Sequence, residues 1–168
     1  MSPYTKALLT AWMNYGDKVR EYPQGRYPGG GNAAYRKEVF DRVGLFNTEL
    51  GRKGNLLLAS EEKDIFDKMK ALGMKVLYLP TPVLHHSIPQ SKLEEDYFNR
   101  LTLQIGRSER MRTRAISKGK YLSRLASEAV KWGGTLALLC IYALQGAPKK
   151  GWKLVLFRRN VTKGLFGG

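Results

Sequence analysis

The stretch SEEKDIFDKMKALGMKVLYL, residues 60–79, contains a helix pattern followed directly by a strand pattern. Apolar side chains at helical spacing predict an amphipathic helix over 61–72, with Ser60 as its N-cap and Gly73 just beyond its C-terminal end. The apolar stripe of this helix consists of Ile65, Phe66, Met69 and Leu72. After the glycine, the apolar and aromatic run at 75–79 is typical of a buried strand, and a proline closes it.

The segments on either side extend this pattern into a fold class. A short helix is expected over 34–43 and a second short strand over 83–86. The capping box at 91–94 then begins a long helix that runs to about residue 112. This order of helix, strand, strand and helix predicts an α/β fold. No glycine-rich βαβ unit opens the chain, so an α/β enzyme with this sequence would lack its nucleotide-binding half.

The positive charge of the chain is concentrated in residues 100–168. The whole sequence has 168 residues, with 29 Lys and Arg against 14 Asp and Glu, a net charge of +15. Residues 1–99 carry 14 basic and 12 acidic side chains, whereas residues 100–168 carry 15 basic side chains and only two acidic ones, Glu109 and Glu128. Such a segment implies an anionic partner, and composition leaves nucleic acid, anionic lipid and a phosphorylated substrate open. The single Cys140 excludes an intramolecular disulfide and a multi-thiolate metal site.

The basic segment also contains the longest apolar run, WGGTLALLCIYAL at 132–144. Thirteen helical residues cover about 20 Å, less than the ~30 Å hydrocarbon core of a bilayer. The run therefore predicts an interfacial or re-entrant segment rather than a clean span. The expected interfacial anchors are Trp132, Trp152 and Phe157. The cations expected to face anionic headgroups are Lys149, Lys150, Lys153, Arg158 and Arg159.

Four local patterns contain residues suited to chemistry. They are the glycine run that ends in Asn32, the acids Glu61, Glu62 and Asp64, the pair His85-His86, and Gln104 with Arg107 one helical turn later. Glycines let the backbone approach a ligand, neighbouring carboxylates favour acid–base chemistry, and a helix face with Gln and Arg suits a diphosphate. Each pattern also has a structural explanation: a flexible turn, acids favoured at a helix start, a packed histidine and an ordinary polar face.

The order of these patterns resembles a known family. Residues 30–40 and then 43–47 resemble the G-x-N-x-x-F-R-R-x-x-F-x-x-V-G-G-F-D segment of family 2 glycosyltransferases, which have the GT-A fold. Residues 60–65 are similar to the G-E-D-x-D-L motif of that family. Two residues depart from the pattern, because Glu62 stands where the family has aspartate and Ser60 where it has glycine.

Further motifs follow in the same order. Residues 72–80 resemble the G-x-x-I-x-Y-V-P strand of the family, and His86 falls on its V-x-H position. Gln104 and Arg107 are similar to the Q-x-x-R element of processive members, whose following Trp is Ser108 here, which favours single addition. The resemblance covers roughly residues 25–112. The nucleotide-binding half with its metal-binding D-x-D is not in this chain.

The resemblance implies a role for each matching residue. Glu62 falls on the catalytic base, which takes the proton of the acceptor hydroxyl, and Glu61 is its companion acid. The residues implied in substrate binding are Gly30, Gly31, Asn32, Arg36, Asp64, Gln104 and Arg107. His86 sits near the diphosphate–metal site of some members. A divalent metal, Mg²⁺ or Mn²⁺, is expected in the full-length enzyme, with its main ligands outside this chain.

Together these features predict a glycosyltransferase fragment with two regions: residues 1–112, a partial GT-A domain, and 113–168, a basic amphipathic tail that associates with membrane. The expected reaction is inverting transfer from a nucleotide-sugar donor to a hydroxyl of a lipid-linked or envelope glycan acceptor. The expected location is the cytoplasmic face of an anionic membrane, as a peripheral or monotopic protein, and the chain alone is expected to be inactive. A nucleic-acid-binding protein and a non-catalytic interaction module are the alternatives. The apolar run and the carboxylate cluster disfavour nucleic acid.

Overall fold

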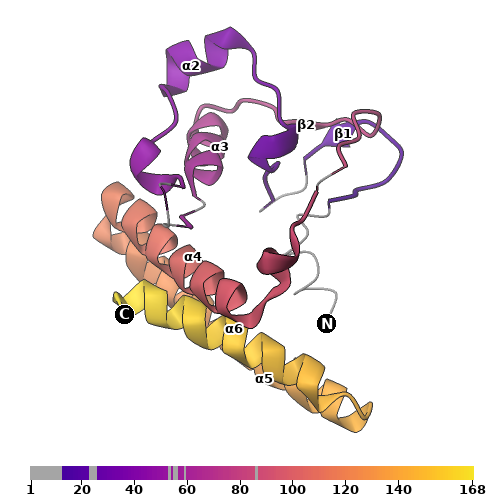
Figure 1. Ribbon diagram of the computed structural model, residues 1–168. Coiled ribbons are helices and arrows are strands. Elements are labelled where there is room, and N and C mark those ends of the chain that lie inside the picture. Colours follow the sequence, from indigo (N-terminus) through magenta and orange to yellow (C-terminus); the bar gives the residue numbers. More distant parts are fainter. Residues whose placement is uncertain (1–12, 23–25, 53, 55–56, 59, 86) are drawn as a thin grey trace.

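The computed structural model describes residues 13–22, 26–52, 54, 57–58, 60–85 and 87–168. They form an upper region of short elements above a layer of three long helices (Figure 1). The upper region contains β1 (Arg20–Glu21), η1 (Gly30–Asn32), α2 (Lys37–Val43), η2 (Thr48–Leu50), α3 (Glu61–Ala71) and β2 (Leu77–Tyr78). The lower layer contains α4 (Glu95–Ile116), α5 (Lys118–Leu144) and α6 (Pro148–Phe166), and η3 (Gln90–Leu93) leads into α4.

The described residues are mostly helical, and their sheet consists of β1 and β2 alone. The two strands are antiparallel, with Arg20 opposite Tyr78 and Glu21 opposite Leu77. This architecture is not a GT-A α/β fold, because such a fold needs a larger sheet covered by helices on its faces. It does not conflict with a fragment of one.

The helix predicted from the opening stretch is confirmed as α3, which ends at Ala71. Three of its stripe residues, Ile65, Phe66 and Met69, are buried among the aromatic side chains around α2. The prediction was wrong for Leu72, whose side chain is 47 % exposed beyond the end of the helix. The Ser60 hydroxyl does not cap α3, because it donates instead to Glu109 Oε1 at 3.4 Å.

The predicted strands are shorter than expected or missing. Only Leu77 and Tyr78 of the 75–79 run form β2, because β1 pairs with just these two residues. Leu77 and Leu79 are about half exposed. Residues 83–85 do not form the second strand. A physical reason is the proline on each side of this stretch, Pro82 and Pro89, since proline has no N–H to donate to a ladder.

Two helix starts also differ from the prediction. α2 begins at Lys37 rather than at 34, because Arg36 is extended with ψ of 144°. The expected capping box does not form at Ser91, which lies in η3, and α4 begins only at Glu95 after an extended Glu94. Local signals placed these helices correctly in the chain but not their first residues.

The three long helices pack tightly against one another. α4 continues past the expected end at 112 to Ile116, so residues 112 and 113 both lie inside it. α4 and α6 cross at Gly106 and Gly164, where a Cβ on Gly106 would lie 2.9 Å from Gly164 Cα. α5 ends at Leu144 and α6 begins at Pro148, so a short turn connects them. No helix in the described segments of the chain is both long and apolar enough to cross a membrane.

Candidate functional site

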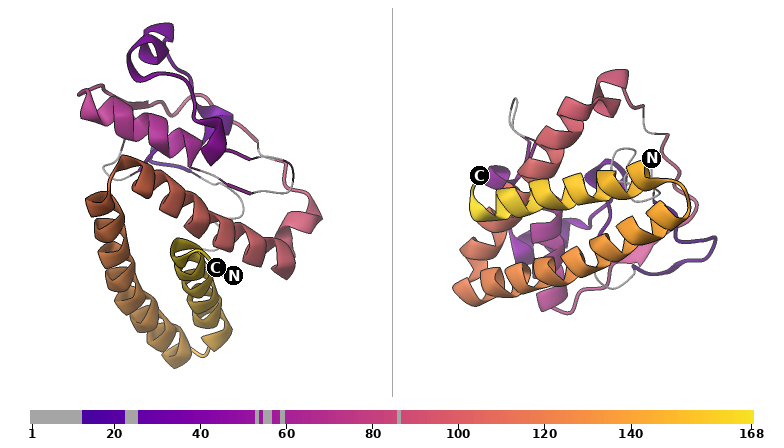
Figure 2. Two further views of the ribbon diagram at one scale, coloured as in Figure 1. Left: turned by 90° about the vertical axis from the view of Figure 1, so that its left-hand side faces the viewer. Right: turned by 90° about the horizontal axis from the view of Figure 1, so that it is seen from below.

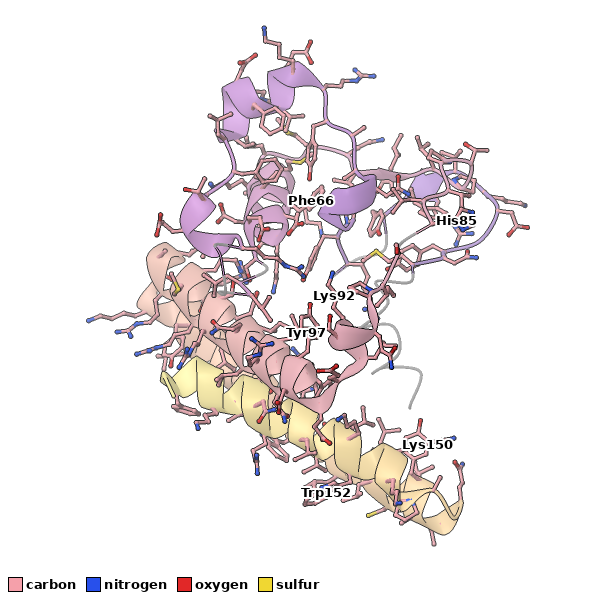
Figure 3. The ribbon with its side chains drawn as sticks, viewed as in Figure 1. Phe66, His85, Lys92, Tyr97, Lys150 and Trp152 are labelled. Carbon is pink, nitrogen blue, oxygen red and sulfur yellow. The ribbon has the colours of Figure 1, made fainter. Side chains whose placement is uncertain are left out.

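A cavity of about 1640 Å³ lies between the glycine run, the start of α3 and the segment that follows β2. Phe66 of α3 and His85 of that segment both line it, and Figure 3 labels them. Six of the residues named by the sequence patterns line it too: Gly30, Gly31, Asn32, Arg36, Glu61 and Glu62. Side chains from segments about thirty residues apart in sequence therefore meet at one place.

Glu62 lies directly against the glycine run. The backbone N–H of Gly30 donates to Glu62 Oε1 at 3.2 Å. A Cβ on Gly30 would collide with that carboxylate oxygen, so a larger residue there would push the Glu62 carboxylate from its present position. The hydrogen bond holds the first turn of α3 to η1 and orients one oxygen of the carboxylate.

Glu61 points toward a different wall of the cavity. Its carboxyl carbon would lie 3.5 Å from a Cβ on Gly51, and its Oε2 is buried without a hydrogen-bond partner among the described residues. Burial is the largest cause that raises the pKa of Glu61, backbone hydrogen bonds partly oppose it, and the charge of Glu62 adds to the rise. Glu61 therefore holds a proton more readily than an ordinary carboxyl group.

Two polar side chains complete this side of the cavity. Asn32 Nδ2 donates to the carbonyl oxygen of Pro82 at 3.1 Å, which ties the glycine run to the segment after β2. The Tyr35 hydroxyl is buried and has no hydrogen-bond partner among the described residues. Burial raises the pKa of Tyr35 to about 12, and the charge of Glu62 contributes further. The hydroxyl therefore stays protonated and is a donor at neutral pH.

The other predicted site residues lie elsewhere. Asp64 pairs with Lys68 at 2.7 Å and does not line the cavity. Gln104 and Arg107 lie on α4, and Arg107 Nε donates to the carbonyl oxygen of Gly168 at 2.9 Å. His86 is outside the described residues. The roles of Asp64, Gln104 and Arg107 in substrate binding and of His86 at a metal stay predictions.

The described residues of the cavity do not form a binding site for a divalent metal. Within the described residues, no three His, Cys, Asp or Glu side chains gather as metal ligands. The two cavity acids point to different walls, as their contacts with Gly30 and Gly51 show.

Sequence patterns missed the role of the two acids of the basic segment. Glu109 is buried, and its Oε2 forms ion pairs with Lys63 Nζ at 2.8 Å, Arg112 Nη2 at 3.2 Å and Arg124 Nε at 3.3 Å. Burial alone would raise the pKa of Glu109, but Lys63 and Arg112 outweigh it and lower that pKa to about 2. The carboxylate therefore joins α3, α4 and α5 while it stays ionised.

Glu128 has a similar role between α5 and α6. It is buried and forms ion pairs with Arg124 Nη1 of its own helix at 2.7 Å and with Arg158 Nη1 of α6 at 2.8 Å. The two arginines overcome the effect of burial and lower the pKa of Glu128. The sequence signal for both acids was their isolation among fifteen basic residues, since an acid in such a segment gains most from pairing.

The chain matches no family model, no curated protein and no solved structure. The likeness to family 2 glycosyltransferases therefore rests on the ordered motifs of the sequence. The cavity contributes a separate fact, namely that the first two of these motifs lie against each other.

Proposed function

We propose that this chain is the acceptor-side, C-terminal portion of an inverting GT-A glycosyltransferase, held at a membrane by residues 113–168. The observation that carries the proposal is the contact between Gly30 and Glu62 in one cavity, because it joins the glycine motif to the acidic motif. The glycine run forms η1 and the acidic motif begins α3, and neither element needs the other in order to form. Their meeting in a cavity is what a binding site for a sugar hydroxyl requires.

In the proposed reaction, an acceptor hydroxyl attacks the anomeric carbon of a nucleotide-sugar. The bond from that carbon to the diphosphate oxygen breaks as the new glycosidic bond forms, and the base takes the hydroxyl proton. The order of acids in the motif assigns the base to Glu62, which Gly30 orients. Glu61, with its raised pKa, is the neighbouring acid and is proposed to hydrogen-bond the acceptor.

The proposed membrane partner is supported by the charge on the tail. The two acids of residues 100–168, Glu109 and Glu128, are buried in ion pairs, so the exposed charge of this segment is basic. Not every expected headgroup contact is available, because Arg158 pairs with Glu128 and Lys153 pairs with Glu95 at 3.0 Å. Lys149, Lys150 and Arg159 are exposed. Of the expected aromatic anchors, Trp152 is exposed while Trp132 and Phe157 are half-buried.

The decisive experiment reads the DNA upstream of this chain for an in-frame segment with a D-x-D motif, joins such a segment to the chain and measures sugar transfer. In an active protein, Glu62→Gln is expected to lower the rate about 10²–10⁴-fold with donor affinity nearly unchanged, because the amide cannot accept a proton. Glu61→Gln is expected to cost less. Glu38→Gln is the matched control, since Glu38 is exposed on α2 and does not line the cavity.

The two variants also show which part of the proposal is wrong if the expected result is not found. A dead Glu61→Gln beside a near-normal Glu62→Gln would reverse the assignment of the base. Near-normal rates for both would reject the carboxylate mechanism. Tight, salt-dependent RNA binding without vesicle binding would instead favour the nucleic-acid alternative.

A further inference from the structure

The helix α5 turns the charged pair Arg124 and Glu128 to the inside of the layer. Glu128 and Thr135 are buried, and Arg124 pairs with both Glu109 and Glu128. The opposite face is apolar and open to solvent, with Leu122 63 %, Val130 77 % and Leu144 90 % exposed. The same exposed side includes Ala126, Ala129, Gly133, Leu136, Ala137, Cys140 and Ile141.

This is the reverse of the usual arrangement in water. A helix on a water-soluble protein turns its apolar stripe to the core and its charged side chains to solvent. Where helices meet lipid, charged side chains face the interior of the bundle and pair there. Arg124 and Glu128 follow the second pattern, and the apolar stripe from Leu122 to Leu144 extends for about 33 Å at 1.5 Å per residue.

The outer face of α5 is open along its length. A Cβ built on Gly133 or Gly134 meets no atom within 4 Å. α5 packs on α6 and on α4 from its inner side, while α2 and α3 lie on the opposite side of α4 (Figure 2). Within the described segments of the chain, no element covers this face.

The charge beside this face indicates what covers it. Lys118, Lys120 and Lys131 are exposed on α5 itself, and Lys149 and Lys150 are exposed where α6 begins. Trp152 projects from α6 on the side away from Lys150 (Figure 3). An aliphatic face bordered by cations and an exposed indole complements an anionic bilayer surface. A second copy fits less well, because two segments of net charge +13 repel each other.

We infer that α5 lies in the plane of an anionic bilayer, with its outer face from Leu122 to Leu144 buried among the acyl chains and its inner face held by α4 and α6. The inference rests on the membrane association proposed above but not on the transfer reaction. It specifies a helix lying on the membrane, with lipid on one side and buried ion pairs on the other.

Cys140 provides a direct test, because the only cysteine of the chain is exposed on this face. An environment-sensitive fluorophore on Cys140 is expected to shift to the blue on vesicles of phosphatidylglycerol and phosphatidylcholine and to be quenched by brominated acyl chains. The matched control is Ser127→Cys in a Cys140→Ser background. Residue 127 is exposed on α5 about 140° around the helix from residue 140, so its label is expected to stay in water.

A second pair of variants tests how much the outer face of α5 contributes to the free energy of vesicle binding. Leu136→Gln replaces a half-exposed apolar side chain on the outer face and is expected to weaken vesicle binding about fivefold or more. Ser127→Gln, on the control side, is expected to leave vesicle binding unchanged. Equal binding by both variants would overturn the inference.

Each other result of the labelling experiment also bears on a named part of the inference. Quenching at both positions would show that α5 is fully inserted, which overturns the in-plane geometry. Vesicle binding with both labels in water would overturn the assigned face but keep the membrane proposal. A label on Cys140 that is blue-shifted without vesicles, with a doubled mass by light scattering, would assign the face to a second copy. No vesicle binding at all would reject both the inference and the membrane partner, and leave the transferase proposal to its own assay.

Discussion

Glu109→Gln is expected to destabilise the protein far more than the same change at an exposed acid. Glu109 accepts hydrogen bonds from Lys63 on α3, Arg112 on α4 and Arg124 on α5, and its side chain is only 7 % exposed. The amide of glutamine nearly preserves its shape but removes the negative charge. Three cations would then face one another around a neutral group, and removing one partner of a buried ion pair typically costs ~3–5 kcal/mol.

The pKa of Glu109 gives an independent magnitude. Its lowering from 4.5 to about 2 corresponds to about 3 kcal/mol at 1.36 kcal/mol for each pH unit. Burial lowers the pKa of Lys63, so some of this stabilisation offsets the desolvation of that ammonium. Because the folded pKa of Glu109 lies below its unfolded value, the contribution is complete above pH 4.5 and is lost as the pH falls toward 2.

Urea unfolding followed by circular dichroism measures the effect. With a slope of ~1–3 kcal/mol per molar urea, a loss of about 3 kcal/mol moves the midpoint by ~1–3 M at pH 7. The gap between wild type and variant is expected to narrow as the pH falls from 4.5 toward 2. Glu95→Gln is the control, because Glu95 pairs with Lys153 but its side chain is 66 % exposed, and such pairs contribute at most ~1 kcal/mol. Equal midpoints for the two variants at pH 7 would refute the reasoning.

Further outcomes are expected for the packing, the tail and the isolated chain. Gly106→Ala is expected to lower the urea midpoint, because its Cβ would lie 2.9 Å from Gly164 Cα, whereas Gly133→Ala has open space and should gain ~1 kcal/mol of helix stability. A stable Gly106→Ala would contradict the close crossing of α4 and α6. Replacing Lys149 and Lys150 by Gln should weaken co-sedimentation with anionic vesicles about tenfold or more at low salt, and unchanged binding would exclude these lysines as headgroup contacts. The purified 168-residue chain should transfer no sugar from any nucleotide-sugar, and product detected by mass spectrometry would contradict the fragment.

The sequence predicted α3 well because its signals are local. The apolar spacing of Ile65, Phe66 and Met69 and the glycine after the helix need no knowledge of distant residues. The strands were predicted poorly because a strand depends on its partner, and β1 supplies two residues only. Leu72 and Leu77 have the right chemistry for a core, but no described element covers them.

The candidate site was only partly predictable, because some of its contacts follow from sequence order or spacing and others depend on how the helices pack. The motif order grouped Gly30 with Glu62, and the two form a hydrogen bond. Spacing also allowed Glu109 to pair with Arg112 within α4. It did not reveal that Lys63 and Arg124 meet at the same carboxylate, because those contacts arise only when α3, α4 and α5 pack.

The missed ion pairs connect the two proposals physically. Lys63 follows Glu62 directly in α3 and binds Glu109 of α4, which also binds Arg124 of α5, and Arg124 binds Glu128 in turn. The helix that carries the candidate acids is thus joined by buried charges to the helix whose outer face is proposed to meet lipid. Buried pairs of this kind resist separation, because pulling them apart strands a charge away from water. If α5 lies on a bilayer, these contacts hold the cavity at a defined height above it, which suits an acceptor hydroxyl presented from the membrane surface.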